Sequence, residues 1–422
     1  MKTNILLSII LLTATVNLSA QEAPASGPAA PEVFEAAGPV DAKTFVPAAM
    51  MAGNLHSVGE QASNDGLQNS YQLTSGGQTI TVTGTPLLIQ RINEIYALDY
   101  LRGLSKTQEF TDALTKSLGD KVNSVVGMVQ DPVGTMKSLP KGASRFFGGI
   151  GEALKGGKSK TEGSMLDKFA GTEKAKAGLA LKLGISPYTD NRELQDELTN
   201  TARVVAGGGL VVSAASMAAT GGAGAALSVI GMNQTLQNAL VNTSASDQRV
   251  INRKRLFALG LDRTDADAFL MHPNYTPWQD TIIVDALARI EANPKAFLQA
   301  ACAASSPEDA FYFQRLAQLL LKYHATSTPI QSIRIENGIV CALDKHATLI
   351  IPVALDYAIW NEHLSARADQ FSALLAGSEK IKAIVIWTDG QLSPRLCDEL
   401  KKRNVSWKML ALGDNNNAEK TQ

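Results

Sequence analysis

The alternation of apolar and polar residues changes along the chain and separates segments of different expected structure. Residues 71–83 alternate apolar and polar side chains on both sides of Gly76 and Gly77, which can adopt the positive φ of a tight turn. This pattern predicts a small β-hairpin. From Leu88 onward, apolar side chains recur every three or four residues, the spacing of one helix face. The stretch 85–325 is therefore predicted to be mainly helical.

Capping signals mark the expected starts of several helices. At four places a hydroxyl residue that can cap a helix stands directly before a proline, whose restricted φ suits the first helical turn. Asp190 and Glu193 add a capping-box pattern. The hydroxyl and proline pairs are Thr85–Pro86, Thr276–Pro277, Ser306–Pro307 and Ser393–Pro394.

From residue 329 the apolar pattern takes a period of two residues. Alternating runs flank Asn337 and Gly338, a dipeptide that is typical of hairpin turns. After a second turn, residues 349–353 form another apolar run. This part of the chain is predicted to be a three-stranded meander.

A repeating unit of helix and strand is expected after the meander. The pattern predicts a helix from about residue 356 to 376 that is stopped by Gly377. Residues 381–390 carry apolar side chains on both faces, as in a central strand that is covered on two sides. A further helix begins at Ser393, and residues 405–412 form the last strand. The unit therefore reads helix-strand-helix-strand, with its last two strands joined by a right-handed parallel crossover.

These patterns predict an α+β fold class. A mainly helical N-terminal and central region with a small hairpin precedes a C-terminal α+β domain. The expected organisation is a signal peptide at 1–20, a flexible Ala/Pro-rich leader at 21–48, a hairpin and helical segment at 71–155, a Lys/Gly linker at 156–164, a helical domain at 165–325, the α+β domain at 329–414 and a disordered tail at 415–422.

Residues 1–20 predict export. Lys2 precedes an apolar run over residues 5–16, and the small residues Ser19 and Ala20 stand before Gln21. This is the layout of a cleavable secretory signal peptide, and the apolar run is short for a membrane span. An uncleaved membrane anchor is the alternative. We expect a mature chain that begins near Gln21 and is secreted or periplasmic.

Composition and charge argue against several classes of function. The 39 Lys and Arg balance 40 Asp and Glu, so no excess of positive charge favours nucleic acid as a partner. The three cysteines, Cys302, Cys341 and Cys397, cannot form a disulfide scaffold, and their pairing is left open. The five histidines never pair with each other or with cysteine at metal-ligand spacing. No metal and no cofactor are expected.

One candidate ligand site lies at the end of the strand predicted over 381–390. Trp387, Thr388, Asp389 and Gly390 stand where the chain turns toward the next helix, and open α/β sheets bind ligands at the carboxyl ends of their strands. In the alternative, Asp389 and Gly390 only form a turn and Trp387 fills the core. No catalytic motif is present, so catalytic residues stay unknown and a non-enzymatic role is favoured.

Two segments raise the possibility of membrane contact. Residues 137–160 interleave basic and aromatic side chains, a pattern that can lie on anionic lipid or pack on a neighbouring helix. Residues 204–232 carry no charge but are rich in Gly and Ala, which favour close helix contact over burial in lipid. A buried helical hairpin is therefore expected there, with membrane insertion as the alternative. The candidate lipid contacts are Lys141, Arg145, Phe146, Phe147, Leu210 and Leu227.

Together these features predict an exported, non-catalytic binding or structural interaction protein of the cell envelope or exterior. Its expected partner is another protein or membrane lipid. One alternative is a membrane-active protein that inserts residues 204–232. The other is a hydrolase or ligand-binding activity in the C-terminal domain, with Asp389 at the site.

Overall fold

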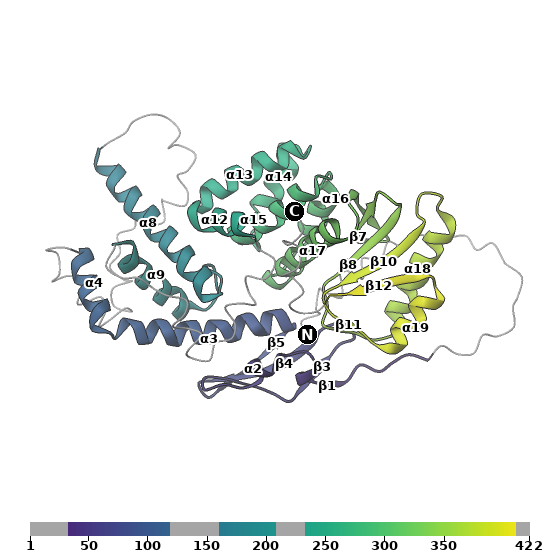
Figure 1. The fold of residues 1–422 in the computed structure, drawn as a ribbon, viewed down its shortest axis with the longest axis horizontal. Helices are drawn as coiled ribbons and strands as arrows, with labels where there is room; N and C mark the ends of the chain where they lie inside the picture. Colours follow the sequence, from purple (N-terminus) through teal and green to yellow (C-terminus); the bar gives the residue numbers. More distant parts are fainter. Residues whose placement is uncertain (1–32, 119–159, 208–232, 411–422) are drawn as a thin grey trace, which may run out of the picture. The chain divides into compact units, whose positions relative to one another are not determined.

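The computed structural model describes residues 33–118, 160–207 and 233–410 (Figure 1). These residues form thirteen α-helices and several sheets, which confirms the mixed α+β class. They divide into two compact units. The first holds residues 33–92 and 233–410, and the second holds residues 93–118 and 160–207.

The first unit begins with a five-stranded antiparallel sheet, which extends beyond the predicted hairpin. The hairpin itself is present, with Gly76 and Gly77 at φ 58° and 78° between its two strands. Three further short strands join it by pairing with β4 or β3. The five strands are β1 (Pro39–Asp41), β2 (Ser57–Val58), β3 (Gln61–Asn64), β4 (Asn69–Ser75) and β5 (Gln78–Thr83).

Residues 33–48 differ from the flexible leader that the sequence predicts for them. They contain β1, the 3-10 helix η1 (Ala42–Thr44) and the start of α2 (Ala48–Met51). Ala42, Phe45 and Val46 are buried, and the Phe45 ring centroid lies 5.5 Å from that of Tyr357. The local sequence pattern does not predict these regular elements, because the contacts that stabilise the segment come from distant parts of the chain.

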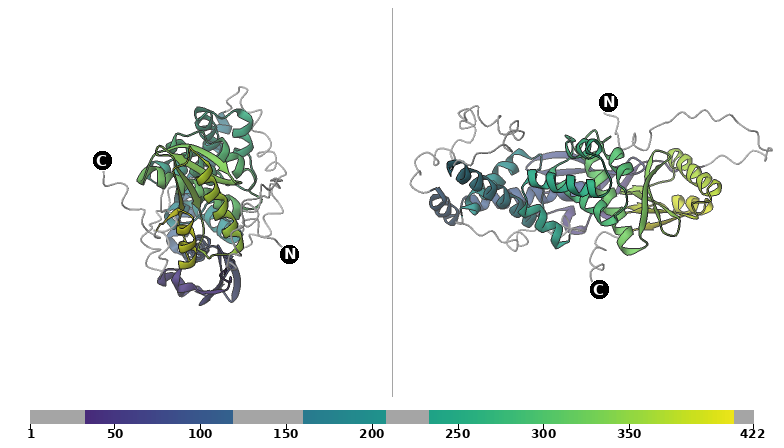
Figure 2. Two further views of the ribbon diagram at one scale, coloured as in Figure 1. Left: turned by 90° about the vertical axis from the view of Figure 1, so that its right-hand side faces the viewer. Right: turned by 90° about the horizontal axis from the view of Figure 1, so that it is seen from above.

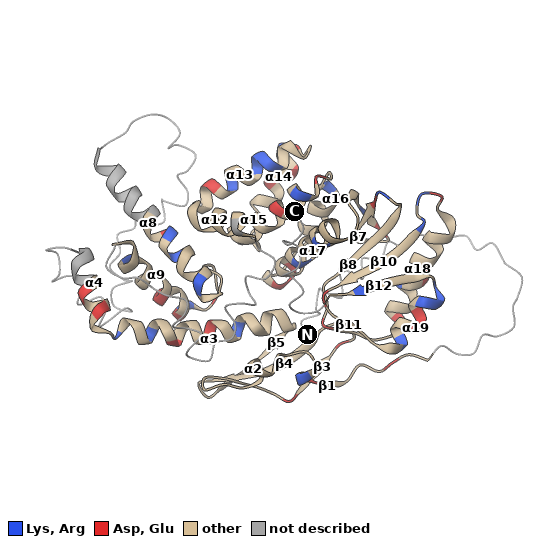
Figure 3. Cartoon of the chain, in the orientation of Figure 1, with Lys and Arg blue, Asp and Glu red and all other residues tan. Residues whose placement is uncertain are grey.

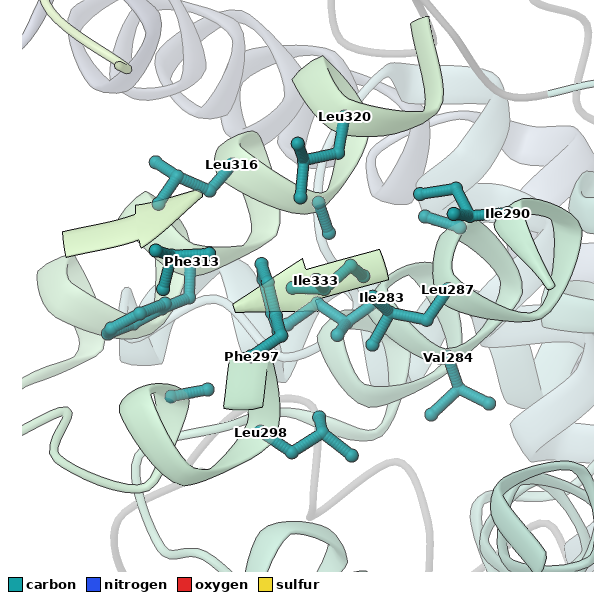
Figure 4. Packing of buried hydrophobic residues seen from close by; sticks show 14 of the residues in the cluster. Ile283, Val284, Leu287, Ile290, Phe297, Leu298, Phe313, Leu316, Leu320 and Ile333 are labelled. Atoms are coloured by element: carbon teal, nitrogen blue, oxygen red, sulfur yellow. The ribbon is translucent and has the colours of Figure 1, made fainter. Parts of the chain in front are cut away.

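A layer of six helices follows in this unit. Thr276 and Ser306 accept a backbone N–H with their side chains at the starts of α15 and α17, and Gln279 completes a capping box with Thr276. Figure 4 shows that apolar side chains of three of these helices, α15, α16 and α17, form one core, in which Ile333 of a neighbouring strand takes part. The helices are α12 (Gln234–Asn242), α13 (Ala245–Ala258), α14 (Arg263–Leu270), α15 (Pro277–Ile290), α16 (Lys295–Ala301) and α17 (Pro307–Thr326).

The second sheet of this unit has the strand order β12-β10-β8-β7-β6. The first three strands in sequence form an antiparallel meander, with Asn337 and Gly338 at φ 50° and 77° in its first turn. The remaining two add in parallel, β10 beside β8 and β12 beside β10. The strands are β6 (Ile330–Glu336), β7 (Ile339–Asp344), β8 (Thr348–Val353), β10 (Ala383–Thr388) and β12 (Val405–Met409).

Helices cover both faces of the second sheet (Figures 1 and 2). The helices α16 and α17 pack on one face, and α18 (Glu362–Gly377) and α19 (Pro394–Lys402) pack on the other. Along β10, Ile384 and Ile386 point into the core with α18 and α19, whereas Val385 and Trp387 point into the core with α17. This alternation explains why the strand is apolar at successive positions.

The predicted helix over 356–376 begins later than expected. Its first residues form the short strand β9 (Tyr357–Ala358), which pairs in parallel with β11 (Gln391–Leu392). Helix α18 starts only after Asn361, whose side chain accepts the backbone N–H of Leu364. The apolar residues before Asn361 belong to this non-local pairing, which helical spacing alone does not distinguish from a first helical turn.

The second unit is helical. It contains the later residues of α3 (Thr85–Ser105), with α4 (Gln108–Leu118), α8 (Lys160–Leu183) and α9 (Arg192–Ala206). Phe110, Ala113 and Val204 form a small buried cluster, and Arg102 binds Glu193 at 2.6 Å. The cap of α9 is Asn191, one residue after the predicted Asp190, because the Asn191 side chain accepts the N–H of Leu194.

Candidate ligand site

A pocket of about 340 Å³ lies where the three parallel strands β8, β10 and β12 reach their carboxyl ends. We call it the edge pocket. Its walls come from the loops after these strands, from α17, from the start of α3 and from the C-cap of η1. The lining residues are Phe45, Thr85, Pro86, Arg315, Leu355, Asp356, Asp389, Gly390, Gln391, Met409 and Leu410.

Of the four residues that the sequence singles out, Asp389 and Gly390 line the edge pocket, whereas Trp387 and Thr388 do not. The Trp387 ring is buried and contacts the Tyr323 ring edge-on, with centroids 5.0 Å apart. The Thr388 hydroxyl accepts the N–H of Gly390 at 3.1 Å, and its side chain has no exposed surface. Trp387 and Thr388 therefore stabilise the end of the strand rather than face the pocket.

An ion pair between Arg315 and Asp389 is the main polar feature of the pocket. The Nε and Nη2 groups of Arg315 donate to Oδ2 of Asp389 at 2.9 and 2.8 Å. The other oxygen of Asp389 accepts the N–H of Leu355 at 3.3 Å. The side chains of Arg315 and Asp389 are only 11% and 26% exposed, so the pair is largely withdrawn from water.

Sequence reasoning did not identify Arg315. The residue lies 74 positions before its partner, within α17, and no motif connects the two. One signal was available. Arg315 is a cation in the middle of a helix whose neighbours Phe313, Leu316 and Ala317 are apolar, and an isolated charge on a buried helix face needs a partner.

A second carboxylate, Asp356, joins three elements at the floor of the pocket. It is 4% exposed, and its two oxygens accept the N–H of Thr85 and the N–H of Asn69, each at 2.9 Å. Thr85 is therefore the first residue of α3 and not its cap, because Asp356 supplies the acceptor for that helix start. Burial raises the pKa of Asp356, while Arg315 and the two backbone donors act in the opposite direction.

Gly390 allows two loops of the pocket to approach closely. A Cβ atom at this position would lie 2.3 Å from the carbonyl oxygen of Leu355 and 2.4 Å from its Cδ1 atom. No real side chain tolerates such contacts without a backbone shift. Glycine is required here because of this contact with Leu355 in the loop after β8.

The lining residues offer binding groups rather than a catalytic set. They include no Ser, Cys, His or Lys, and the two carboxylates are both engaged by donors of the protein. Throughout the described ranges, no group of His, Cys, Asp and Glu could hold a metal ion. All three cysteines are free thiols, and burial raises the pKa of each.

The Asp356→Asn variant tests the role of this carboxylate in joining the elements. An amide presents only one acceptor oxygen, so either the N–H of Thr85 or the N–H of Asn69 loses its acceptor in a buried place. We expect the free energy of unfolding to fall by about 1 to 3 kcal/mol. Urea denaturation followed by circular dichroism measures this loss. The exposed Asp398→Asn change is the control, and equal stability of the two variants would contradict the assignment.

The candidate lipid contacts Lys141, Arg145, Phe146, Phe147, Leu210 and Leu227 lie outside the described residues. Among the helices that the structure does describe, none combines the length and the apolar character needed to span a membrane. The predictions about the two segments that contain these residues stay predictions.

Comparison of the chain with protein-family models, with curated proteins and with solved structures found no match. The fold and the site by themselves define the class of this protein, an α+β protein with a pocket at the edge of a mixed sheet.

Proposed function

We propose that this chain is a non-catalytic binding protein whose ligand site is the edge pocket. The observation that carries the proposal is the Arg315–Asp389 pair, held at the meeting point of three strand ends in a pocket with largely apolar walls. Pockets for small molecules commonly combine apolar walls with a few fixed polar groups, and α/β sheets form them at the carboxyl ends of their strands.

Binding is favoured over the alternative of a hydrolase at Asp389. A general base or nucleophile must be free to reach the substrate, but both oxygens of Asp389 already accept hydrogen bonds from Arg315 and Leu355. The other carboxylate of the lining, Asp356, is 4% exposed, and its two oxygens already accept the N–H groups of Asn69 and Thr85. The Asp389 carboxylate is well suited to hold Arg315 in one orientation for a ligand.

The predicted leader makes export part of this proposal, so the ligand would be met in the periplasm or outside the cell. Nucleic acid is not among the proposed partners. Basic side chains predominate on α13 (Figure 3), but Arg253 binds Asp267 of α14 at 2.6 Å and Arg255 binds Asp285 of α15 at 3.4 Å. Such ion pairs reduce the positive charge that this helix could offer to nucleic acid.

The proposal is tested by screening the mature protein against a library of small metabolites and following its melting temperature. A pocket-filling Met409→Trp variant should lose every stabilising response of the wild type, because Met409 lines the pocket and is 42% exposed. Met271→Trp is the matched control at another exposed methionine, away from the pocket. A ligand that stabilises wild type and Met409→Trp equally would place the binding site elsewhere.

A further inference from the structure

Every charged group that lines the edge pocket already makes hydrogen bonds within the protein. Arg315 is neutralised by Asp389, and Asp356 accepts two backbone N–H groups, one of them at the start of α3. The N-terminus of a helix carries about half a positive charge, which offsets part of the Asp356 charge. A charged ligand would therefore lose its hydration, while Arg315 is already neutralised and the Asp356 carboxylate, 4% exposed, is already engaged by two N–H groups.

The pocket nevertheless keeps hydrogen-bonding capacity for a neutral ligand. The Nη1 group of Arg315 makes no hydrogen bond to a described residue and can still donate. The Oδ1 atom of Asp389 accepts only the N–H of Leu355, so one of its two lone pairs can still accept a hydrogen bond. A donor on Arg315 and an acceptor on Asp389 thus belong to the lining of one pocket, and a carboxamide presents the complementary acceptor and donor.

The rest of the lining limits how polar such a ligand can be. Apart from Thr85 and Gln391, the uncharged side chains of the lining are apolar, and they come from Phe45, Pro86, Leu355, Met409 and Leu410. A polyhydroxylated molecule would leave most of its groups unsatisfied against these side chains, which costs free energy. An apolar body that carries a single polar group satisfies both parts of the pocket.

We propose that the edge pocket binds a neutral ligand in which an apolar body is joined to a carboxamide, as in a short apolar peptide or a simple amide. This inference rests on the proposed function and specifies the ligand class of the same site. The carbonyl oxygen of the carboxamide accepts a hydrogen bond from Nη1 of Arg315, and the N–H of the carboxamide donates a hydrogen bond to Asp389. The apolar body lies against Phe45, Met409 and Leu410.

Three probes with the same side chain and different charge test the ligand class at neutral pH. They are N-acetyl-leucinamide, which is neutral, N-acetyl-leucine, which carries a carboxylate, and leucinamide, which carries an ammonium group. Titration into the isotopically labelled mature protein, followed by amide chemical shifts, gives each dissociation constant. The dissociation constant of the neutral probe should be at least about fivefold lower than that of either charged probe, because a charged probe loses its hydration without gaining a free counter-charge.

Two variants make the test specific to the ion pair. In Asp389→Asn the Arg315 guanidinium loses its counter-charge, so the preference should reverse toward the anionic N-acetyl-leucine. In Arg315→Met the neutral probe should lose about fivefold or more in affinity. Arg334→Met is the matched control, because Arg334 binds Glu336 on β6 and does not line the pocket. Preserved dispersion of the amide spectrum shows that each variant is folded.

The results separate this inference from the proposed function. Tighter binding of a charged probe to the wild type, or no shift of pocket resonances with any probe, overturns the neutral carboxamide class. The binding function itself would still stand if a stabilising metabolite from the library loses its effect in Met409→Trp. Unchanged charge preference in Asp389→Asn would also count against the inference, because the ion pair would then not control ligand choice.

Discussion

Replacing Gly390 with alanine should lower the free energy of unfolding by about 2 to 3 kcal/mol, because the new methyl group collides with a neighbouring loop. The added Cβ would lie 2.3 Å from the Leu355 carbonyl oxygen and 2.7 Å from its carbonyl carbon. Both are backbone atoms, so rotation of a side chain cannot relieve the contact. The loops after β8 and β10 must separate, and the edge pocket should open with them. Urea unfolding followed by circular dichroism measures the loss.

Gly377→Ala is the matched control for this change. Gly377 is the last residue of α18, and a Cβ atom there would meet no heavy atom within 4 Å. Alanine at a compatible helical position is neutral or stabilises by about 0.5 to 1 kcal/mol. If both alanine variants unfolded at the same urea concentration, the close approach of Gly390 to Leu355 would not describe the folded protein.

A large pH-dependent effect is expected from Asp280, a buried carboxyl in α15. The side chain is 5% exposed, and its Oδ1 atom has no hydrogen-bond partner within the described part of the chain. Burial raises the pKa of Asp280 to about 8, against 3.8 as the ordinary value, and Arg249 offsets only part of this effect. The folded protein therefore keeps this proton at pH values where the unfolded chain has released it.

The direction of the pH effect follows from this difference in proton binding. Between about pH 4 and pH 8 the Asp280 carboxyl is protonated in the native state and largely ionised in the unfolded state, so its contribution to the free energy of unfolding falls as pH rises, by up to about 1.4 kcal/mol per pH unit. The stability that the protonated Asp280 carboxyl contributes is fully present below the pKa of this group in the unfolded chain. It is lost as pH rises through the pKa of the group in the folded protein. Asp280→Asn stays neutral and should lack this decline.

Urea denaturation of wild type and Asp280→Asn over the range from about pH 5 to pH 8 tests this expectation. The stability of the variant relative to wild type should increase by up to about 4 kcal/mol across the range, because other titrating groups cancel in the difference. The control variant Asp398→Asn, at an exposed position, should show the same change in the free energy of unfolding with pH as the wild type. Parallel curves for Asp280→Asn as well would mean that the Asp280 carboxyl is ionised without penalty in the folded state.

The helix starts and hairpin turns could be predicted from the sequence where their causes are local. Asn337 and Gly338 adopt positive φ between β6 and β7, and Ser393 accepts the N–H of Leu396 at the start of α19. In each case a residue's own conformational preference, or a hydrogen bond spanning three residues, decides the structure. The mixed α+β class follows from such local signals together with the apolar period.

The predicted boundary at residue 329 shows where local patterns become insufficient. A change from helical to alternating periodicity occurs there, but the two sides share one core. The Tyr323 hydroxyl of α17 donates to Asp344 at 2.7 Å, and the Tyr323 ring packs on Trp387. Periodicity reports the type of element and which of its faces is apolar, whereas it carries no information about which partner covers that face.

The sequence by itself determined that a polar turn, Asp389 and Gly390, follows a strand that is buried on both faces. This turn supplies two of the residues that line the edge pocket. Only the tertiary structure decided what that turn meets. Arg315 comes from 74 residues before Asp389, and Asp356 binds backbone donors 271 and 287 residues away. The physical reason is that a buried charge requires a partner but accepts one from any part of the chain, so the partner is chosen when the layers pack.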